Sequence, residues 1–410
     1  MNILYLSHRI PYPPNKGDKI RSYNMIKYLV KLGKVYVAAL VDNPDDFQFQ
    51  AKLEEICEKV VLSPLIPAAK KIKSLLALAT GKPLSVPYFY EKKLQIQIDY
   101  LIDSCNFDVV ICFSSPMAEY VYHSRIFSEK KELGRPILLM DFCDVDSEKW
   151  AEYAKRSSFL MSNIYHREWQ RLGKYEYEVA RKFDHSFFVS LREQNLFQKN
   201  HPDVTSVSSI SNGVDTLFFK PFPVNANKQE ERTEIVFTGA MDYYANVDGV
   251  CWFVDKIWPL IKNTILDARF MIVGSNPAKE ILKLHDDDNI IVTGFVEDIR
   301  EYYSRATVCV APLRIARGIQ NKVLEAMAMA KAVVCTGNAF EGINANPNED
   351  LIIADENEDF AAQVIRLVLD KKLRQQIEVN ARQCVEQHYN WETSLMKLEQ
   401  FIHVRHCGLP

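Results

Sequence analysis

Short apolar runs alternate with amphipathic stretches along the whole chain, and this alternation sets the expected architecture. The runs are rich in Val, Ile, Leu and Phe, which is typical of strands buried on both faces of a parallel sheet. In the first half the predicted strands are Ile3–Ser7, Val35–Val41, Val60–Leu62, Val109–Phe113, Ile137–Asp141 and Ser186–Ser190. In the second half they are Ile235–Thr238, Phe270–Val273, Ile290–Thr293, Val308–Ala311, Ala332–Cys335 and Leu351–Ala354.

Helical periodicity fills the intervals between these runs. The clearest case is Lys19–Leu32, where apolar residues form one stripe and Gly33 follows as a stop signal. Further helices are predicted over Val247–Ile261, Asp298–Arg305, Gln320–Ala330 and Glu358–Val368. Strands that alternate with helices indicate an α/β fold with doubly wound parallel sheets.

The chain is long enough for two such domains. It has 410 residues, and single cores stop growing at roughly 250–300 residues. The polar, proline-containing stretch Pro221–Arg232 has no periodicity and is interpreted as the linker. We therefore expect one domain over 1–220 and a second over 221–389, with a last helix at about 390–410 that returns to the first domain.

Composition narrows the function classes. The net charge is −3, whereas nucleic-acid-binding domains are usually strongly basic, so nucleic acid is not an expected partner. The nine cysteines show no Cys-x-x-Cys spacing, which gives no support for a zinc site. The N-terminus lacks the pattern of a signal peptide, and no apolar run reaches the roughly 18 residues of a membrane span. These features predict a cytoplasmic protein.

The strongest candidate for a functional site in the sequence is the segment Val310–Thr336. A strand ends at Pro312, a short basic loop follows, and a helix begins near Gln320. A helix N-terminus after a parallel strand presents free backbone N–H groups and a positive dipole end, which suits a phosphate. The loop and helix supply the candidate residues Arg314, Arg317, Gly318, Ile319, Gln320, Asn321, Lys322 and Glu325.

Within this group, Gly318 allows close backbone approach, and Arg314, Arg317 and Lys322 are possible phosphate cations. Glu325 could accept two hydrogen bonds from a ribose diol. A solvated loop before an ordinary helix, with Lys322 and Glu325 as a surface ion pair, is the alternative.

Several stretches resemble family 4 glycosyltransferases of the GT-B fold, and the resemblance covers nearly the whole chain. Val323–Thr336, VLEAMAMAKAVVCT, is similar to the family signature, and Ser211–Phe219, SNGVDTLFF, is similar to the segment that opens the C-terminal domain. Gly294–Ala311 resembles the Gly-x-Val segment and the helix and strand after it. The N-terminal NKGDKIRSYNMIKYL is similar to the glycine loop and first helix. Met140–Trp150, MDFCDVDSEKW, is similar to sugar transferases of bacterial exopolysaccharide clusters, including those associated with PEP-CTERM and exosortase systems.

The resemblance implies two Rossmann-like domains facing a cleft, and a sugar-nucleotide donor held mainly by the C-terminal domain. It implies ribose contact for Glu325, base contact for Gly294, Phe295 and Val296, and donor or acceptor contact for the loop at Gly17 and Asp18. A tight turn capped by Asp18 is the alternative for that loop.

The sequence also departs from the family pattern in two places. Arg317 stands where the first glutamate of the Glu-x7-Glu motif belongs, and Gly239–Asn246 lacks the usual Arg/Lys pair.

The activity implied is retaining, metal-independent transfer of a sugar from a UDP- or GDP-sugar to a glycan or lipid-linked acceptor. Charge on the departing nucleoside diphosphate makes preorganised donors there the largest expected catalytic contribution. A UDP-sugar 2-epimerase and a non-catalytic scaffold that binds nucleotide sugar are the other hypotheses.

Asp144 and Asp146 form an Asp-x-Asp pair that could instead hold a metal, and His8 and His123 are candidate cleft residues.

One further segment, residues 66–97, predicts a peripheral contact with anionic membrane. It carries six lysines and one acid, interleaved with apolar and aromatic residues. Lys70–Leu78 could form a short basic amphipathic helix suited to an anionic lipid interface. A core-packed helix with a solvated lysine face is the alternative.

Overall fold

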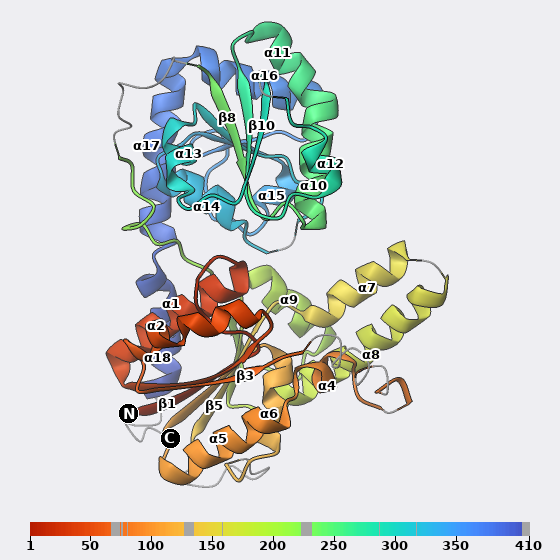
Figure 1. Cartoon of the computed structure of the whole chain (residues 1–410), viewed down its shortest axis with the longest axis vertical. Coiled ribbons are helices and arrows are strands. Elements are labelled where there is room, and N and C mark those ends of the chain that lie inside the picture. The colour runs from red at the N-terminus through yellow and green to blue at the C-terminus, as the bar shows by residue number, and fades with distance from the viewer. Residues whose placement is uncertain are drawn as a thin grey trace. The chain divides into compact units, whose positions relative to one another are not determined.

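A computed structural model of the chain divides into two compact units, each with its own parallel sheet (Figure 1). Unit 1 comprises Met1–Ser211 and Leu395–Pro410, and unit 2 comprises Asn212–Ser394. The boundary falls at Ser211, where the sequence placed it at 220. The structure describes residues 1–66, 74, 77–79, 81–126, 135–157, 159–222, 232–286, 288–316 and 318–403. Most of the expected linker, 223–231, lies outside this description.

Unit 1 contains a seven-stranded sheet in the order β3-β2-β1-β4-β5-β6-β7, and neighbouring strands pair in parallel. Its strands are β1 Asn2–Ser7, β2 Lys34–Val41, β3 Lys59–Pro64, β4 Val109–Phe113, β5 Ile137–Cys143, β6 His185–Phe188 and β7 Val207–Ser209. β1, β2 and β4 are almost wholly buried because helices cover both faces of the sheet.

The helices of unit 1 flank this sheet, with α1 and α2 on one side and α5 and α6 on the other (Figure 1). Their bounds are α1 Gly17–Leu32, α2 Gln50–Glu54, α4 Ser85–Phe89, α5 Lys92–Ser104, α6 Ala118–Tyr122, α7 Asp146–Arg156, α8 Phe159–Lys182 and α9 Leu191–Asn200. Short 3-10 turns occur at Pro44–Phe49, Ala77–Ala79 and Ser115–Met117.

A buried ion pair fastens α1 to the sheet of unit 1. Arg21 Nε and Nη2 donate to the two carboxylate oxygens of Asp141 on β5 at 2.7 and 3.0 Å. Its Nη1 donates to the Ile210 carbonyl oxygen at 2.7 Å. Both side chains are fully buried, so the bidentate geometry and the extra hydrogen bond are what make their burial tolerable.

Unit 2 contains a six-stranded parallel sheet in the order β10-β9-β8-β11-β12-β13. Its strands are β8 Glu234–Thr238, β9 Arg269–Val273, β10 Ile290–Gly294, β11 Val308–Ala311, β12 Val333–Cys335 and β13 Ile352–Ile353. The first part of each order, 3-2-1-4-5, is shared by the two sheets and is the doubly wound Rossmann arrangement. The α/β fold class expected from the sequence is confirmed.

The helices of unit 2 again cover both faces, with α13, α14 and α17 on one side and α10, α11 and α12 on the other (Figure 1). Their bounds are α10 Tyr244–Trp252, α11 Trp258–Thr264, α12 Lys279–Leu282, α13 Arg300–Arg305, α14 Asn321–Ala328, α15 Gly337–Phe340, α16 Asn357–Leu369 and α17 Lys371–His388. A π-helical turn, η5 Phe253–Ile257, joins α10 to α11.

Differences from the expected elements have local causes. The single helix predicted over Val247–Ile261 is interrupted by η5, and Pro259, which cannot donate a backbone hydrogen bond, lies just after it. The sequence did not predict β7, because this strand has only three residues and two of them are serines. α1 begins at Gly17, two residues before the predicted start, and its N-cap is Lys16, not Asp18.

The last helix, α18 Trp391–His403, contributes to unit 1 from Leu395 onward. Tyr28 on α1 donates its hydroxyl to Glu399, and Phe401 stacks on His185 of β6 with ring centroids 3.7 Å apart. Among the residues described here, no helix combines the length and apolar character needed to cross a bilayer.

Candidate functional site

The connections reverse direction between β8 and β11 in the sheet of unit 2. The chain moves from β8 to β9 on one side and from β11 to β12 on the other. Ligands of doubly wound sheets bind outside the carboxyl ends of the strands at such a switch point. The loop after β8 and the loop between β11 and α14 meet this condition.

The loop after β8 is closely packed on the end of β9. Gly239 N donates to the Val273 carbonyl at 3.0 Å, and Met241 N donates to the Ser275 carbonyl at 2.8 Å. Gly239 and Gly274 have φ values of +155° and +152°, and a side chain on Gly274 would collide with the Gly239 carbonyl oxygen. Glycine is therefore required at both positions.

Lys322, in the first turn of α14, reaches back under this loop. Its Nζ donates to Asn246 Oδ1 at 2.5 Å and lies 4.2 Å from the ring centroid of Phe237. A side chain on Gly239 would come within 3.0 Å of the same Nζ. Burial lowers the pKa of Lys322 to about 7, while the charge of Glu325 opposes the shift.

Glu325 lies one turn further along α14. Its Oε2 accepts a hydrogen bond from the Tyr303 hydroxyl at 3.1 Å, and that hydroxyl also contacts Thr238 Oγ1 at 2.7 Å. Burial raises the pKa of Glu325, whereas the Tyr303 hydrogen bond and the Lys322 charge oppose the rise. Lys322 forms no salt bridge with Glu325 within the described part of the chain, so the surface ion pair considered above is not formed.

The start of α14 has the features of an anion site. Its N-cap, Gln320, makes no side-chain capping hydrogen bond, so the first backbone N–H groups are not closed by that residue. Gly318 has φ +64°, and Ile319 is 8% exposed and anchors the loop. Asn321 Oδ1 is buried without a hydrogen-bond partner in the described structure. Arg317 lies outside the described residues.

Arg314 is held apart from Lys322. Its Nε and Nη2 donate to the Asp248 carboxylate at 3.0 and 2.5 Å. Asp248 and Asn246 are two residues apart on α10, and two residues turn a helix by about 200°. The two cations therefore bind opposite sides of the same helix.

The predicted base-contact segment follows β10. Gly294 has φ +70° and ends the strand. Phe295 is 75% exposed, and Val296 packs partly against the core of unit 2. An exposed aromatic ring beside an anchored valine can cover the face of a planar ligand.

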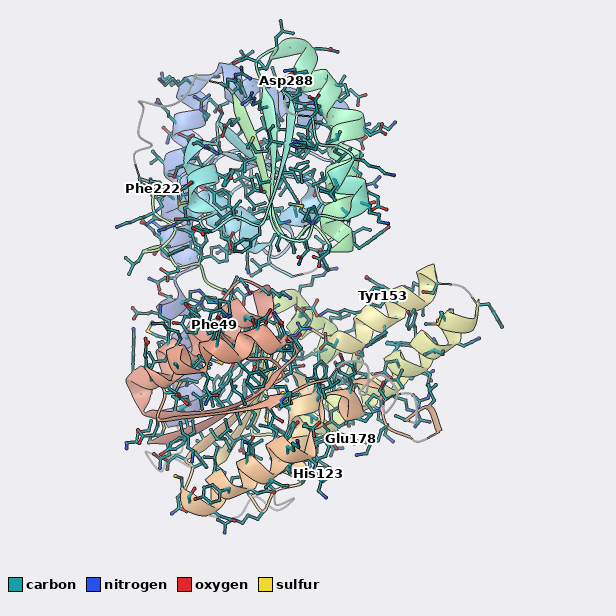
Figure 2. The ribbon with its side chains drawn as sticks, in the orientation of Figure 1. Phe49, His123, Tyr153, Glu178, Phe222 and Asp288 are labelled. Carbon is teal, nitrogen blue, oxygen red and sulfur yellow. The ribbon has the colours of Figure 1, made fainter. Side chains whose placement is uncertain are left out.

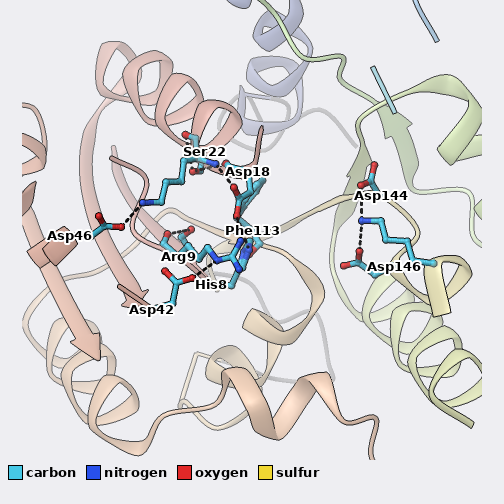
Figure 3. A network of polar contacts seen from close by, with 12 residues as sticks. His8, Arg9, Asp18, Ser22, Asp42, Asp46, Phe113, Asp144 and Asp146 are labelled. Carbon is cyan, nitrogen blue, oxygen red and sulfur yellow. Dashed lines mark hydrogen bonds and ion pairs between the residues drawn. The ribbon is translucent and has the colours of Figure 1, made fainter. Parts of the chain in front are cut away.

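In unit 1 the predicted loop residues lie in a polar network (Figure 3). Asp18 Oδ2 accepts from Arg9 Nη1 at 2.7 Å and lies 3.5 Å from His8 Nε2. Burial alone would raise the pKa of Asp18, but the hydrogen bond from His8 and the charges of His8 and Arg9 hold it well below its usual range. Gly17 is exposed, and a side chain there would meet nothing within 4 Å.

A lysine side chain binds both aspartates of the Asp-x-Asp pair. Lys149 Nζ donates to Asp144 and Asp146 at 2.8 Å each (Figure 3). Both charges raise the pKa of Lys149 against the opposing effect of burial. No group of three or more His, Cys, Asp or Glu side chains is arranged for a metal within the described ranges.

The two candidate histidines have structural contacts. His123, at the end of α6 (Figure 2), has Nδ1 2.8 Å from the Glu119 carbonyl oxygen and stacks near Tyr90. His8 Nδ1 lies 3.4 Å from the Phe113 carbonyl oxygen and its ring stacks on Phe113.

The sequence did not identify Asn246, Tyr303 or Asp248 as partners of the site. Asn246 belongs to a loop that differs from the family pattern, and Tyr303 lies in a helix whose aromatic residues all look like core. Their roles depend on contacts between segments 22 to 76 residues apart, which local patterns do not encode.

One protein family matches a large part of unit 2. Residues 232–370 match the family described as Glycosyl transferases group 1. This match lies entirely within unit 2. The matched segment contains both β8 and α14, and hence Lys322, Glu325 and their partners.

Solved structures with the same fold extend over the whole chain. Sucrose-phosphate synthase from Thermosynechococcus elongatus aligns over 100% of both chains with a TM-score of 0.72 and 15% identity. Anabaena HepE in complex with UDP aligns over 98% of this chain and 99% of its own, with a TM-score of 0.67 and 14% identity. The fold is therefore GT-B.

A sequence relative covers both units. It is a Klebsiella pneumoniae protein described as an uncharacterized 44.6 kDa protein in cps region, 22% identical over 95% of this chain and 96% of its own length. Together with the group 1 match, it supports a glycosyltransferase in polysaccharide synthesis.

The environment of Lys322 predicts a pH-dependent stability cost. Its pKa is about 7 in the folded chain and about 10.4 in an unfolded chain. Between these values the unfolded state binds more protons, so this residue makes the free energy of unfolding rise with pH. We expect Lys322→Met to stabilise the protein more at pH 6 than at pH 9, by about 1–3 kcal/mol, in urea unfolding.

Lys331→Met is the matched control, because Lys331 in unit 2 donates to two backbone carbonyls instead. An equal effect of Lys322→Met at both pH values would contradict the buried position of the amino group.

Proposed function

We propose that this protein is a retaining, metal-independent glycosyltransferase. It moves a sugar from a UDP- or GDP-sugar to a glycan or lipid-linked acceptor in exopolysaccharide or cell-surface glycan synthesis. The observation that carries the proposal is the Lys322 amino group, held under the glycine loop after β8 at the start of α14. The group 1 match over the same elements supports it.

Lys322 is the cation we assign to the donor diphosphate. The groups that contact its amino group are neutral: its hydrogen-bond partner is an amide, and its aromatic neighbour is uncharged. A diphosphate would supply two negative charges and restore the protonated form that burial disfavours. When the glycosidic bond breaks, negative charge grows on this phosphate, so a preorganised cation lowers the barrier.

The place of Lys322 also accounts for the missing Arg/Lys pair after β8. In this chain the cation comes from α14 and reaches the β8 loop from below. Arg314 is engaged by Asp248, so we assign it no direct role on the diphosphate. The backbone N–H groups at Asn321 and Lys322 complete the phosphate site.

Glu325 is the proposed ribose ligand. Tyr303 and Thr238 fix the Oε2 side of its carboxylate. Within the described residues Oε1 accepts no hydrogen bond, so it can take a ribose hydroxyl. Gly294, Phe295 and Val296 are proposed to cover the base, and the exposed backbone at Gly17 to contact donor or acceptor. The strong ion pairs of Asp18 support a structural role for its side chain.

Two features support chemistry without a metal. The Asp144–Asp146 pair already binds Lys149, and a cation at the diphosphate is supplied by Lys322. In retaining transfer, the leaving phosphate oxygen would take the proton of the attacking hydroxyl on the same face of the sugar. HepE, whose fold is similar, is known in complex with UDP-glucose, which supports UDP-glucose as the first donor to test.

A non-catalytic scaffold is the second candidate, because Arg317 stands where the family carries a glutamate facing the donor sugar. A scaffold and a transferase bind donor equally. Release of UDP from UDP-sugar with acceptor present distinguishes them, since only the transferase turns over.

The acceptor side is proposed to contact anionic membrane through residues 66–97. Lys70, Lys71 and Lys73 fall outside the described residues. Of the remainder, Lys92 and Lys93 are exposed at the start of α5, whereas Lys82 pairs with Glu119. A lipid-linked acceptor would make reversible surface attachment useful.

Glu325→Ala should weaken binding of UDP-glucose or GDP-mannose, whichever binds the wild-type protein, by about 10- to 150-fold. A hydrogen bond to a charged group contributes about 1.5–3 kcal/mol. Isothermal titration calorimetry measures the affinity. Glu301→Ala, an exposed glutamate on α13, is the matched control. A folded Glu325→Ala protein that keeps wild-type affinity would refute the ribose assignment.

Lys322→Ala should reduce kcat by more than tenfold, whereas Asp144→Asn and Asp146→Asn should each change it by less than threefold. One interaction with developing charge is typically worth about 2.7–4 kcal/mol, or 10²–10³ in kcat. Sugar transfer is measured with and without EDTA. The opposite ranking, with activity abolished by EDTA and restored by Mn²⁺, would show that the aspartates bind an essential metal.

The membrane proposal predicts co-sedimentation with vesicles of phosphatidylglycerol and phosphatidylcholine that decreases with salt. Each lysine near an anionic surface contributes about 1 kcal/mol, so the triple change of Lys70, Lys71 and Lys73 to Glu should abolish it. Lys27, Lys31 and Lys34 changed to Glu form the charge-matched control. No sedimentation of wild-type protein at low salt would eliminate the membrane contact.

A further inference from the structure

Unit 2 contains a polar cavity at the carboxyl ends of β11, β12 and β13. Its volume is about 540 Å³, within the range of about 300–1,000 Å³ that small-molecule sites occupy. The walls include Trp252 at the end of α10, Arg314 after β11, Asn338 after β12, and Asp355, Glu356 and Asn357 after β13. The residues that line it do not include Lys322, Glu325 or Tyr303.

The helix α10 separates this cavity from the proposed nucleotide site. One side of α10 presents Asn246 to Lys322, and the opposite side presents Asp248 to Arg314. Because Arg314 lines the cavity while bound to Asp248, its charge is already matched. Among the described residues, the cavity therefore offers no uncompensated cation.

Charge excludes a phosphate from this cavity. Asp355 and Glu356 are both exposed acids on its wall. One carboxylate oxygen of Asp355 accepts from Gly337 N at 2.8 Å, and in the described structure the Glu356 carboxylate accepts no hydrogen bond. A diphosphate or sugar phosphate would be repelled by these carboxylates.

The remaining polar groups suit a ligand with many hydroxyls. Asn338 uses Nδ2 to bind the Arg314 carbonyl at 3.0 Å, which leaves its Oδ1 as an acceptor. Asn357 accepts from Trp252 Nε1 at 2.9 Å, which leaves its Nδ2 as a donor and fixes the indole. The carboxylates, the amides and the indole wall together match the alternating polar and apolar surface of a sugar ring.

We propose that this cavity is a carbohydrate subsite that holds an uncharged hexose unit of a glycan. Glu356, Asp355 and Asn338 accept its hydroxyl hydrogens, Asn357 donates to a hydroxyl oxygen, and Trp252 forms the apolar wall. Binding here does not depend on sugar transfer. If the function proposed above holds, the subsite keeps a glycan attached to unit 2 between transfers, and that consequence alone rests on the proposed function.

The test is a titration of the full-length protein with neutral oligosaccharides, followed by intrinsic tryptophan fluorescence and by calorimetry. The probes are tetrasaccharides of glucose, galactose, mannose and N-acetylglucosamine, with spermidine as the cationic probe. We expect saturable binding of at least one tetrasaccharide, unchanged by a saturating concentration of UDP. Glu356→Gln and Asn338→Ala should each weaken it by about fivefold or more, since each removes or weakens a hydrogen bond.

Glu358→Gln is the matched control, because Glu358 is an exposed acid in the first turn of α16, two residues after Glu356, and does not line the cavity. Trp252→Phe should remove the fluorescence response while calorimetry still detects binding. The proposal is overturned if no tetrasaccharide binds, if UDP competes, if Glu356→Gln and Asn338→Ala bind as tightly as Glu358→Gln, or if only spermidine binds. Donor affinity of Lys322→Ala is a separate measurement, so failure of this subsite leaves the nucleotide site unaffected.

Discussion

The burial of one amino group organises the candidate site of unit 2. Lys322 must bring its charge beneath the β8 loop, where an amide and an aromatic ring are its neighbours. That position exists only because residue 239 is glycine and because the β8 loop sits on the Gly274 backbone. A cation that is hydrogen-bonded but not paired with a carboxylate is costly in the empty protein, and the cost is relieved when an anion binds. Relief of this cost therefore adds to the free energy of anion binding.

Sheet topology explains why these groups can meet. In both units the strand order reverses beside the first strand, and doubly wound sheets bind ligands outside the carboxyl ends of the strands at such a point. At this point unit 2 has the contacts of Lys322 and Glu325, whereas unit 1 has ion pairs of Asp18 with His8 and with Arg9. The same architecture therefore gives unit 2 a lysine that, among the described residues, pairs with no carboxylate, and gives unit 1 a network of paired charges.

The sequence predicted the strands well because buried parallel strands are continuous apolar runs, and the runs at Val109–Phe113 and Val308–Ala311 match the observed bounds. It also selected Lys322 and Glu325, since a basic loop before a helix has a local signature. The sequence could not predict that Arg314 would pair with Asp248, or that Lys322 would donate to Asn246, because both contacts depend on how α10 packs beside α14. The Asp144–Asp146 pair looked like a metal site in sequence, and only the placement of Lys149 shows that a side chain occupies it.

We propose that burial makes Lys322 lose its proton easily and that a bound donor diphosphate restores the protonated form. The most direct measurement is a ¹³C NMR titration of the lysine Cε signals, with Lys322→Arg used to assign the signal. We expect a midpoint at about pH 7 for Lys322 in the free protein and a clear upward shift when UDP-glucose or GDP-mannose is bound. A midpoint near the ordinary lysine value of about 10.4 in the free protein, or one that a bound nucleotide sugar leaves unchanged, would contradict it.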